Sequence, residues 1–383
     1  LTQEGAEVIR IVGMVGRGYH PWTTKVLQAR LRDRALLKVA RKISRPLETR
    51  VVTWVSRHGL SGFLSGLNDL LNEFQPDVVN MHNLHGNAWG PELVAVCTRY
   101  APTIWTLHDM WSFTGRCAYN YDCRKFIAGC DASCPTPGEY PALAPKLIEG
   151  AWKLRRRLFA DLADLVAVCP SRWLAQEALA GLWAGHRVEV IPYGLPLDVY
   201  LPCDRTLART TLGIDGREPV LLVVAQSLMM RRKGGAILNE ALQKVRHRPL
   251  TLITLGHGAL PVTAEGIRVH ALGQIDRQQT VALAYNAADL LVHSAWADNL
   301  PNVVLEAMAC GTPCVGFVIG GVPDMVRPGL TGWLAPEVTA EALANAIDDA
   351  LMAIKQGADL RSSCRAVAEA EYAAPIQARR HLA

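Results

Sequence analysis

Short apolar runs alternate with amphipathic, helix-like stretches along the whole chain of 383 residues. In the first half the apolar runs lie at 8–12, 51–55, 77–81, 102–107, 164–168 and 187–191. In the second half they lie at 220–225, 250–255, 267–272, 289–292 and 313–317, with a short last run at 333–334. Strands that alternate with helices build parallel sheets through βαβ units. The pattern therefore predicts an α/β protein with two Rossmann-like domains.

A segment rich in helix breakers separates the two halves. Residues 191–202 contain Pro192, Gly194, Pro196 and Pro202, which is typical of an interdomain hinge. We expect an N-terminal domain over 1–192, a C-terminal domain over 193–365, and a C-terminal helix over 366–383 that crosses back to the first domain. Ligands of open parallel sheets bind beyond the carboxyl ends of the strands. We therefore expect a cleft between two facing sheets, lined by residues that follow strands.

Composition excludes several classes of protein. Half of the residues are hydrophobic and 20% are charged, which is ordinary globular usage and argues against a disordered chain or a coiled coil. The apolar runs are far shorter than the roughly 20 residues that a membrane span needs. The net charge of +5 is too small at this length to indicate a nucleic-acid partner. The start of the chain has no signal-peptide pattern, so we expect a cytoplasmic protein.

The N-terminal region carries the most uneven charge. Between Lys25 and Arg50 nine residues are basic and two are acidic, interleaved with apolar residues. This stretch is either a solvated helix that rests its apolar stripe on the core or a peripheral contact with an anionic membrane surface, at the inner face of the membrane. Residues 1–12 resemble the end of a helix, a glycine stop and a strand, so we expect the first domain to begin upstream of Leu1.

Two carboxylates follow the strand at 289–292. Asp298 lies in a loop, and Glu306, which seven residues separate from it, lies on the helix that follows Asn299, Leu300 and Pro301. The first amides of such a helix are free to bind an anion, and carboxylates accept hydrogen bonds from sugar hydroxyls. The alternative is structural: Asp298 would cap the helix and Glu306 would be an acid of its first turn.

A run of cations follows the strand at 220–225. Arg231, Arg232 and Lys233 precede Gly234 and Gly235 at a predicted helix start. Positive charge and free amides converge at such a point, which favours a diphosphate site. An ordinary solvated surface run is the alternative.

A histidine closes the strand at 102–107. His108 and its neighbour Asp109 stand at the carboxyl end of this strand, and residues 83–87 follow the strand before it. Either group can line a cleft, although a lone histidine at a strand end is more often hydrogen-bonded locally.

Four of the ten cysteines fall within one loop, 115–135. They are Cys117, Cys123, Cys130 and Cys134. Close thiols in a reducing compartment favour a tetrahedral structural zinc site, with free thiols or disulfides as alternatives, since paired Cys-x2-Cys knuckles are missing. We interpret the six scattered cysteines as small core residues.

The stretch 294–328 resembles the retaining glycosyltransferases of family 4, also called group 1, which have the GT-B fold. The resemblance rests on the two acids separated by seven residues, on Ala307 to Pro313, and on Gly320 to Asp324. It implies that Asp298 contacts the donor sugar and that Glu306 holds the donor ribose. The loop and helix start, Asn299, Leu300, Pro301, Asn302 and Val303, would approach the sugar or the diphosphate.

The resemblance extends to residues outside that stretch. It implies that Lys233 and Arg232 bind the diphosphate, that the backbone near Leu272 contacts the base, and that His108 faces the sugar. Two positions depart from the family pattern: Asp298 stands where a Glu is usual, and Leu228 stands where an Arg is usual.

The implied activity is transfer of a hexose from a nucleotide-diphosphate sugar, of the UDP-glucose or UDP-N-acetylglucosamine type, to a lipid-linked or polysaccharide acceptor. The resemblance implies no cofactor for catalysis. Similar cysteine-rich insertions occur in a polysaccharide-assembling branch of the family. A GT-B sugar-nucleotide epimerase and a non-catalytic sugar-nucleotide or zinc-binding scaffold remain as alternatives.

Overall fold

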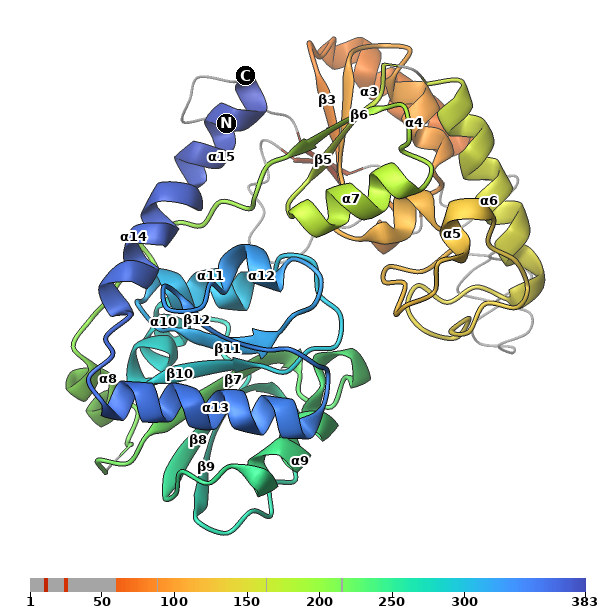
Figure 1. Cartoon of the computed structure of the whole chain (residues 1–383). Coiled ribbons are helices and arrows are strands. Elements are labelled where there is room, and N and C mark those ends of the chain that lie inside the picture. The colour runs from red at the N-terminus through yellow and green to blue at the C-terminus, as the bar shows by residue number, and fades with distance from the viewer. Residues whose placement is uncertain (1–9, 13–23, 27–59, 88, 163, 215) are drawn as a thin grey trace, which may run out of the picture. The chain divides into compact units, whose positions relative to one another are not determined.

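The computed structural model describes residues 10–12, 24–26, 60–87, 89–162, 164–214 and 216–383 (Figure 1). The chain divides into two compact units, one of residues 1–169 and 175–189, the other of residues 170–174 and 190–383. Among the described helices, none is long and apolar enough to cross a membrane.

The first unit is built on a parallel sheet of four strands. Their order is β3 (Val79–Met81), β4 (Thr103–Thr106), β5 (Val166–Cys169) and β6 (Arg187–Val190). The α-helices described in this part of the chain are α3 (Leu60–Phe74), α4 (Glu92–Cys97), α5 (Lys125–Ala128), α6 (Pro145–Ala160) and α7 (Arg172–Ala180). Two 3-10 turns, η2 (His85–Asn87) and η3 (Met110–Phe113), follow β3 and β4 directly. A separate parallel pair joins β1 (Arg10–Val12) to β2 (Thr24–Val26).

The second unit contains a six-stranded parallel sheet. The strand order is β12 (Gly332–Ala335), β11 (Cys314–Phe317), β10 (Leu290–His293), β7 (Val220–Ser227), β8 (Leu250–His257) and β9 (Ile267–Gly273). Its helices are α8 (Arg205–Thr211), η4 (Arg231–Lys233), α9 (Gly235–Lys244), α10 (Gln278–Ala287), α11 (Asn302–Ala309), α12 (Val322–Met325), α13 (Ala340–Lys355), α14 (Arg361–Glu371) and α15 (Ala374–Leu382).

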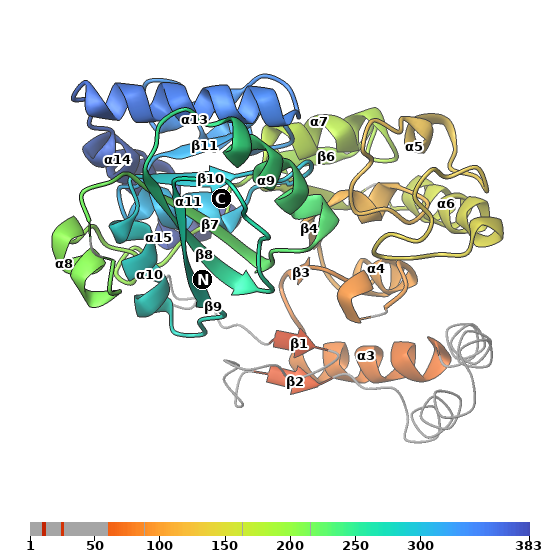
Figure 2. The same cartoon turned by 90° about the horizontal axis from the view of Figure 1, so that it is seen from below.

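Helices cover both faces of this sheet, which explains its apolar strands. Leu221 and Leu290 pack with α9 and α13, whereas Leu222 and Leu291 pack with α10, α11 and α14. Figure 2 shows the strands between α13 on one side and α10 on the other. Strands buried on both faces need apolar side chains at nearly every position. The edge strand β9 is half-exposed, in agreement with its mixed sequence.

The predicted strands from residue 77 onward are each present, with ends shifted by at most a few residues. The run 8–12 contains β1, while the run 51–55 lies outside the described residues. The helical interpretation of the basic stretch is wrong at its start, because Lys25 and Val26 belong to strand β2 and pair with β1. Residues 27–50 lie outside the described part of the chain, and so does any contact that they make with a membrane.

The breaker-rich segment is attached to the C-terminal residues of the second unit. The Leu195 amide donates to the Tyr372 carbonyl at 2.8 Å, and the Ala374 amide donates to the Leu195 carbonyl at 3.1 Å. A Cβ at Gly194 would lie 2.6 Å from the Cα of Ala374, so only glycine permits this approach. Residues 366–383 fall within the second unit in this division, and their predicted crossing to the first domain stays a prediction.

One buried carboxylate joins three parts of the second unit. Asp289, directly before β10, accepts from Arg205 Nη1 at 2.6 Å, from Arg209 Nη2 at 2.7 Å and from the Val220 amide at 2.7 Å. Its side chain is 10% exposed. The acid therefore holds α8 against the start of β7.

Replacing Asp289 with Ala should lower the free energy of unfolding of the second unit by about 3 kcal/mol, because it leaves buried donors without their acceptor. Asp349→Ala, which removes an exposed acid from α13, should change it by less than about 0.5 kcal/mol. Urea unfolding of the full chain measures both. Equal stability of the two variants would contradict this account of Asp289.

Candidate functional site

Two loops at the carboxyl edge of the six-stranded sheet are joined by backbone contacts. They follow β7 and β10, which are neighbouring parallel strands. Ser294 Oγ donates to the Lys233 carbonyl at 3.0 Å, and the Trp296 amide donates to the Arg232 carbonyl at 3.0 Å. Arg232 Nη1 donates to the Ala297 carbonyl at 2.7 Å. The cation run and the acid loop, more than 60 residues apart in sequence, thus form one structure.

Gly234 is required for this approach. It has a left-handed backbone with φ of 71°, and a Cβ there would lie 1.8 Å from the Ser294 carbonyl oxygen. Only glycine adopts this conformation without steric cost and leaves room for the neighbouring backbone. The glycine after Lys233 therefore fixes where the cation lies.

Asp298 is buried between these cations. Lys233 Nζ lies 2.5 Å from Asp298 Oδ2, and Arg232 Nη1 lies 3.4 Å from Oδ1. Burial acts to raise the pKa of the Asp298 carboxyl, but the charges of Lys233, His293 and Arg232 outweigh it and hold this pKa below its ordinary value. The structure thus brings together three predicted site residues, and the two cations favour the ionised form of the acid.

A histidine that the sequence analysis did not consider lies beside this acid. His293 ends β10, its side chain is 4% exposed, and its Nε2 lies 3.6 Å from Asp298 Oδ2. Within the described part of the chain this Nε2 has no hydrogen-bond partner. Burial lowers the pKa of His293 to about 4. The sequence gives one sign of a functional role for His293: a titratable residue directly follows the apolar run 289–292.

Helix α11 begins directly after the acid loop. Its N-cap is Pro301 and it has no side-chain cap, so the structural alternative in which Asp298 caps this helix is wrong. Helix geometry leaves the amides of Asn302 and Val303 without an acceptor in the helix. Leu300 and Pro301 are buried and hold the turn in place.

Glu306 is the fifth residue of α11, so it is not the first-turn acid of the structural alternative. Its Oε2 accepts from the Tyr285 hydroxyl at 2.7 Å, and the Tyr200 hydroxyl also bonds to this carboxylate. Burial raises the pKa of Glu306 against both hydrogen bonds. Neither tyrosine could be predicted as a partner from the sequence, because no local pattern links them to position 306.

The chain matches two sequence models of one family. Residues 218–353 match "Glycosyl transferases group 1" and residues 20–199 match "Glycosyltransferase Family 4". The chain belongs to the family 4, or group 1, glycosyltransferases.

A curated relative agrees with this assignment, and solved structures share the fold. A protein of Escherichia coli (strain K12) named for glycosyl transfer in colanic acid biosynthesis, WcaC, is 31% identical over 218 residues, or 55% of this chain and 51% of that protein. The chain thus spans about half the length of this curated relative. Sucrose-phosphate synthase from Thermosynechococcus elongatus has a similar structure, with a TM-score of 0.69 and 20% identity over 100% of this chain and 89% of that one. Anabaena Alr3699/HepE in complex with UDP-glucose has a TM-score of 0.57 and 18% identity over 93% and 84%. These likenesses confirm the predicted GT-B fold.

The glycines of the family stretch 320–324 allow close packing against the acid loop. A Cβ at Gly320 would lie 1.8 Å from the Asp298 carbonyl oxygen, and one at Gly321 would lie 2.0 Å from that of Asn299. A Cβ at Gly321 would also lie 2.5 Å from the Cβ of Ser171. This motif of the family therefore positions the Asp298 backbone.

Residues 170–174, which belong to the second unit, hold the other side of this loop. Ser171 Oγ donates to Asn299 Oδ1 at 2.5 Å and accepts from the Leu174 amide at 3.1 Å. Arg172 donates to Asp324 through its amide at 2.8 Å and through Nε at 3.0 Å. Nothing in the sequence identified Ser171, because its partner lies 128 residues away.

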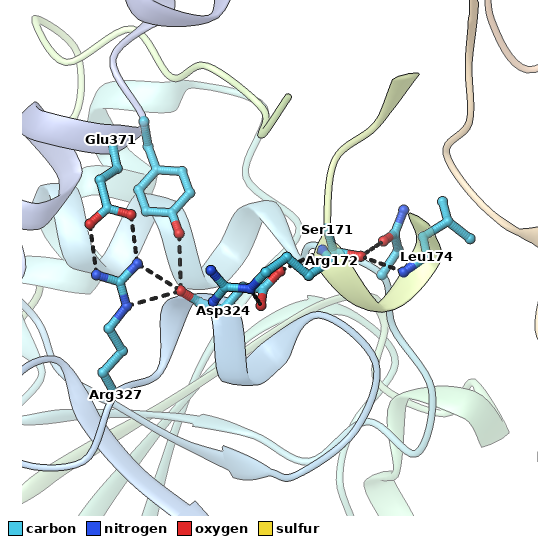
Figure 3. A network of polar contacts seen from close by, with 8 residues as sticks. Ser171, Arg172, Leu174, Asp324, Arg327 and Glu371 are labelled. Atoms are coloured by element: carbon cyan, nitrogen blue, oxygen red, sulfur yellow. Dashed lines mark hydrogen bonds and ion pairs between the residues drawn. The ribbon is translucent and has the colours of Figure 1, made fainter. Parts of the chain in front are cut away.

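Figure 3 shows how this anchor continues to the C-terminal helices. The Asp324 carbonyl accepts from Arg327 Nη2 at 3.0 Å and from the Tyr372 hydroxyl at 3.2 Å. Arg327 also forms a two-bond ion pair with Glu371, at 2.7 and 2.6 Å. The loop that carries Asp298 and Asn299 is thus part of a continuous polar network within the second unit.

Leu228, one of the two positions that depart from the family pattern, is a core residue. Leu228 is 2% exposed, and its carbonyl lies 2.4 Å from where a Cβ at Gly235 would be, so this position is core. Arg232 is the arginine that the structure places beside Lys233. Leu272 is half-buried in the edge strand β9, and its predicted contact with a base stays a prediction.

His108 of the first unit belongs to a cluster of histidines. Its Nε2 lies 2.9 Å from His82 Nδ1, and burial lowers its pKa. Asp109 caps η3 by accepting from the Trp111 amide at 2.9 Å, and it lies 3.2 Å from His85 Nε2. The segment 83–87 and the strand end at 108 therefore meet at the carboxyl edge of the four-stranded sheet, and the role of His108 toward a sugar stays a prediction.

The four loop cysteines are close enough to interact electrostatically. Burial raises the pKa of Cys117 and raises that of Cys130 to about 11, with contributions from Cys123 and Cys134 in both cases. All four are free thiols. Over the described ranges, no group of three or more His, Cys, Asp or Glu side chains is arranged to hold a metal ion. A structural zinc here stays a prediction, and absence of zinc from protein purified without chelator would remove it.

The scattered cysteines match the core interpretation with one exception. Cys97, Cys169, Cys310, Cys314 and Cys364 are buried, whereas Cys203 is half-buried.

Replacing Glu306 with Gln should not lower the stability of the folded chain at pH 7. Burial raises the pKa of Glu306 in the folded state, so its ionisation costs stability as the pH rises above its unfolded value of about 4.3. The variant should gain relative to wild type through that window, because the amide oxygen of Gln has two lone pairs that can accept from the Tyr285 and Tyr200 hydroxyls. Urea unfolding from pH 4 to 8 measures this difference. Glu341→Gln, at an exposed acid of α13, is the control and should show no such trend.

Proposed function

We propose that this chain is a retaining glycosyltransferase that moves a hexose from a UDP-sugar to a glycan acceptor. The observation that carries the proposal is the buried Asp298 held by Lys233 and Arg232 beside the start of α11. Cations and free helix amides bind a diphosphate, and a carboxylate next to them accepts hydrogen bonds from a sugar. These are the two halves of a nucleotide-sugar donor.

In the proposed reaction the bond between the sugar C1 and the diphosphate oxygen breaks, and an acceptor hydroxyl oxygen bonds to C1. The acceptor's proton passes to the departing phosphate on the same face of the sugar, so configuration is retained. Lys233 and Arg232 stabilise the negative charge that develops on the diphosphate. Asp298 orients the sugar through its hydroxyls, and Glu306 holds the ribose.

The comparisons support the choice of donor and acceptor. HepE shares the fold and is described in complex with UDP-glucose, which favours a uridine donor of the glucose or N-acetylglucosamine type. WcaC is named for colanic acid biosynthesis, which favours a polysaccharide or lipid-linked acceptor. Attraction between the basic stretch 25–50 and an anionic membrane would bring the protein close to a lipid-linked acceptor.

A calorimetric panel of uridine, guanosine and adenosine diphosphates with their sugar conjugates tests this proposal. We expect only the uridine series to bind. Glu306→Ala should weaken this binding by roughly 10- to 100-fold, because it removes a charged hydrogen-bond acceptor. Binding followed by transfer to a glycan separates a glycosyltransferase from an epimerase, which would interconvert the sugar nucleotide alone. Binding without turnover would favour a scaffold.

Lys233→Ala should lower kcat by roughly 100-fold or more, because it removes a preorganised charge from the leaving diphosphate. Lys244→Ala is the matched control, since this lysine ends α9 of the same unit and its side chain is 43% exposed. Initial rates of UDP release measure both. Wild-type rates in Lys233→Ala would remove the leaving-group role from this residue.

A further inference from the structure

The buried ion cluster contains one group without a partner. Lys233 and Arg232 neutralise Asp298, whereas the Nε2 of His293 is buried and unpaired in the described part of the chain. The carboxylate oxygen Asp298 Oδ2 is 3.6 Å away, just beyond hydrogen-bond distance. A buried polar nitrogen without a partner costs about 1–3 kcal/mol, so its retention calls for an explanation.

A ligand would change the charges around this nitrogen. His293 and Lys233 line one small cavity at the carboxyl ends of β7 and β10, together with Ser294 and Gly235. A diphosphate bound to Lys233 and Arg232 adds negative charge close to both cations. Asp298 then loses part of its counter-charge, and a buried carboxylate needs a compensating donor.

We propose that His293 supplies this donor, so that binding of a nucleotide-diphosphate sugar is coupled to uptake of a proton by His293. The inference rests on the proposed function, because it assigns a further positioning residue to the same site. The proton comes from solvent and ends on the imidazole ring. Nε2–H then donates to Asp298, and no bond between heavy atoms forms or breaks.

The electrostatics of the free chain agree with this coupling. Burial, together with the charges of Lys233 and Arg232, keeps the pKa of His293 at about 4, while Asp298 acts to raise it. On the neighbouring strand β11, burial raises the pKa of the Cys314 thiol well above its usual range, so this thiol stays neutral beside the His293 backbone. A bound diphosphate offsets the two cations and leaves Asp298 to favour the protonated ring.

The test is calorimetry of UDP-glucose binding to the full chain at pH 6.5, in buffers of different ionisation enthalpy. UDP-glucose is the probe because neither of its esterified phosphates titrates near neutral pH. If the pKa of His293 returns to its ordinary value near 6.5, wild type takes up about half a proton per ligand. His293→Gln should take up no proton. As the pH falls below 6.5, the affinity of wild type for UDP-glucose should rise by at most tenfold per pH unit, and the affinity of the variant should not show this rise. His257→Gln, at an exposed histidine that ends β8, is the control and should match wild type.

Each outcome separates the inference from the proposed function. Wild-type binding without proton uptake overturns the role of His293 and leaves the donor site in place. No binding of UDP-glucose to wild type contradicts the proposed uridine donor and the inference with it. If His293→Gln does not fold, the ring carbon shifts of His293 in wild type give the same answer: an NMR titration should show its pKa rising when UDP-glucose is added, and an unchanged pKa would overturn the proposal.

Discussion

The candidate site depends on the ion pair between Lys233 and Asp298. A buried carboxylate without a partner would be too costly to keep ionised, and a cation beside it offsets that cost. The pair forms only because β7 and β10 are neighbours in a parallel sheet, so their following loops meet at one edge. Glycine at 234 then lets the backbone of one loop lie against the other. The strand order therefore places the two loops together, and the contact between the loops places Lys233 beside Asp298.

Under the proposed function, the same pair gives the site two states that differ in charge. In the free chain Lys233 and Arg232 already pair with Asp298, so their positions are set without a ligand. In the proposed function, an incoming diphosphate would compete with Asp298 for Lys233. Such competition lowers affinity for the ground state, but it keeps the cation at the place where charge develops on the leaving group. His293 matters in this picture because it is buried and its Nε2 lies 3.6 Å from Asp298 Oδ2.

Much of the fold could be predicted because it is written in local patterns. The run 220–225 is apolar at nearly every position, as a strand covered on both faces must be, and the structure places β7 at the centre of the sheet. The positions of the acid loop and the cation run could be predicted because each follows such a strand, and the structure brings Asp298, Arg232 and Lys233 together. Strand β2 could not be predicted, since Thr24 to Val26 is short and merges into a basic, helix-like stretch.

The partners within the site could not be predicted for a different reason. Ser171 meets Asn299, and Tyr285 meets Glu306, through tertiary packing that no spacing in the chain encodes. His293 reads as the last residue of a buried strand, and only its position against Asp298 distinguishes it from a core histidine. Sequence patterns therefore predict helices, strands and their ends, whereas the pairing of side chains from different elements is seen only in the folded structure.

The assignment of residues 170–174 to the second unit limits how the chain can be divided. A fragment that begins at residue 190 would hold every strand of the six-stranded sheet. It would nevertheless lack the serine that fills the space above Gly321 and the arginine that pairs with Asp324. The loop that carries Asp298 would lose its packing and hydrogen bonds on one side, although its own sequence would be intact. The second unit is therefore built from two separate pieces of sequence, and a single cut at residue 190 yields an incomplete unit.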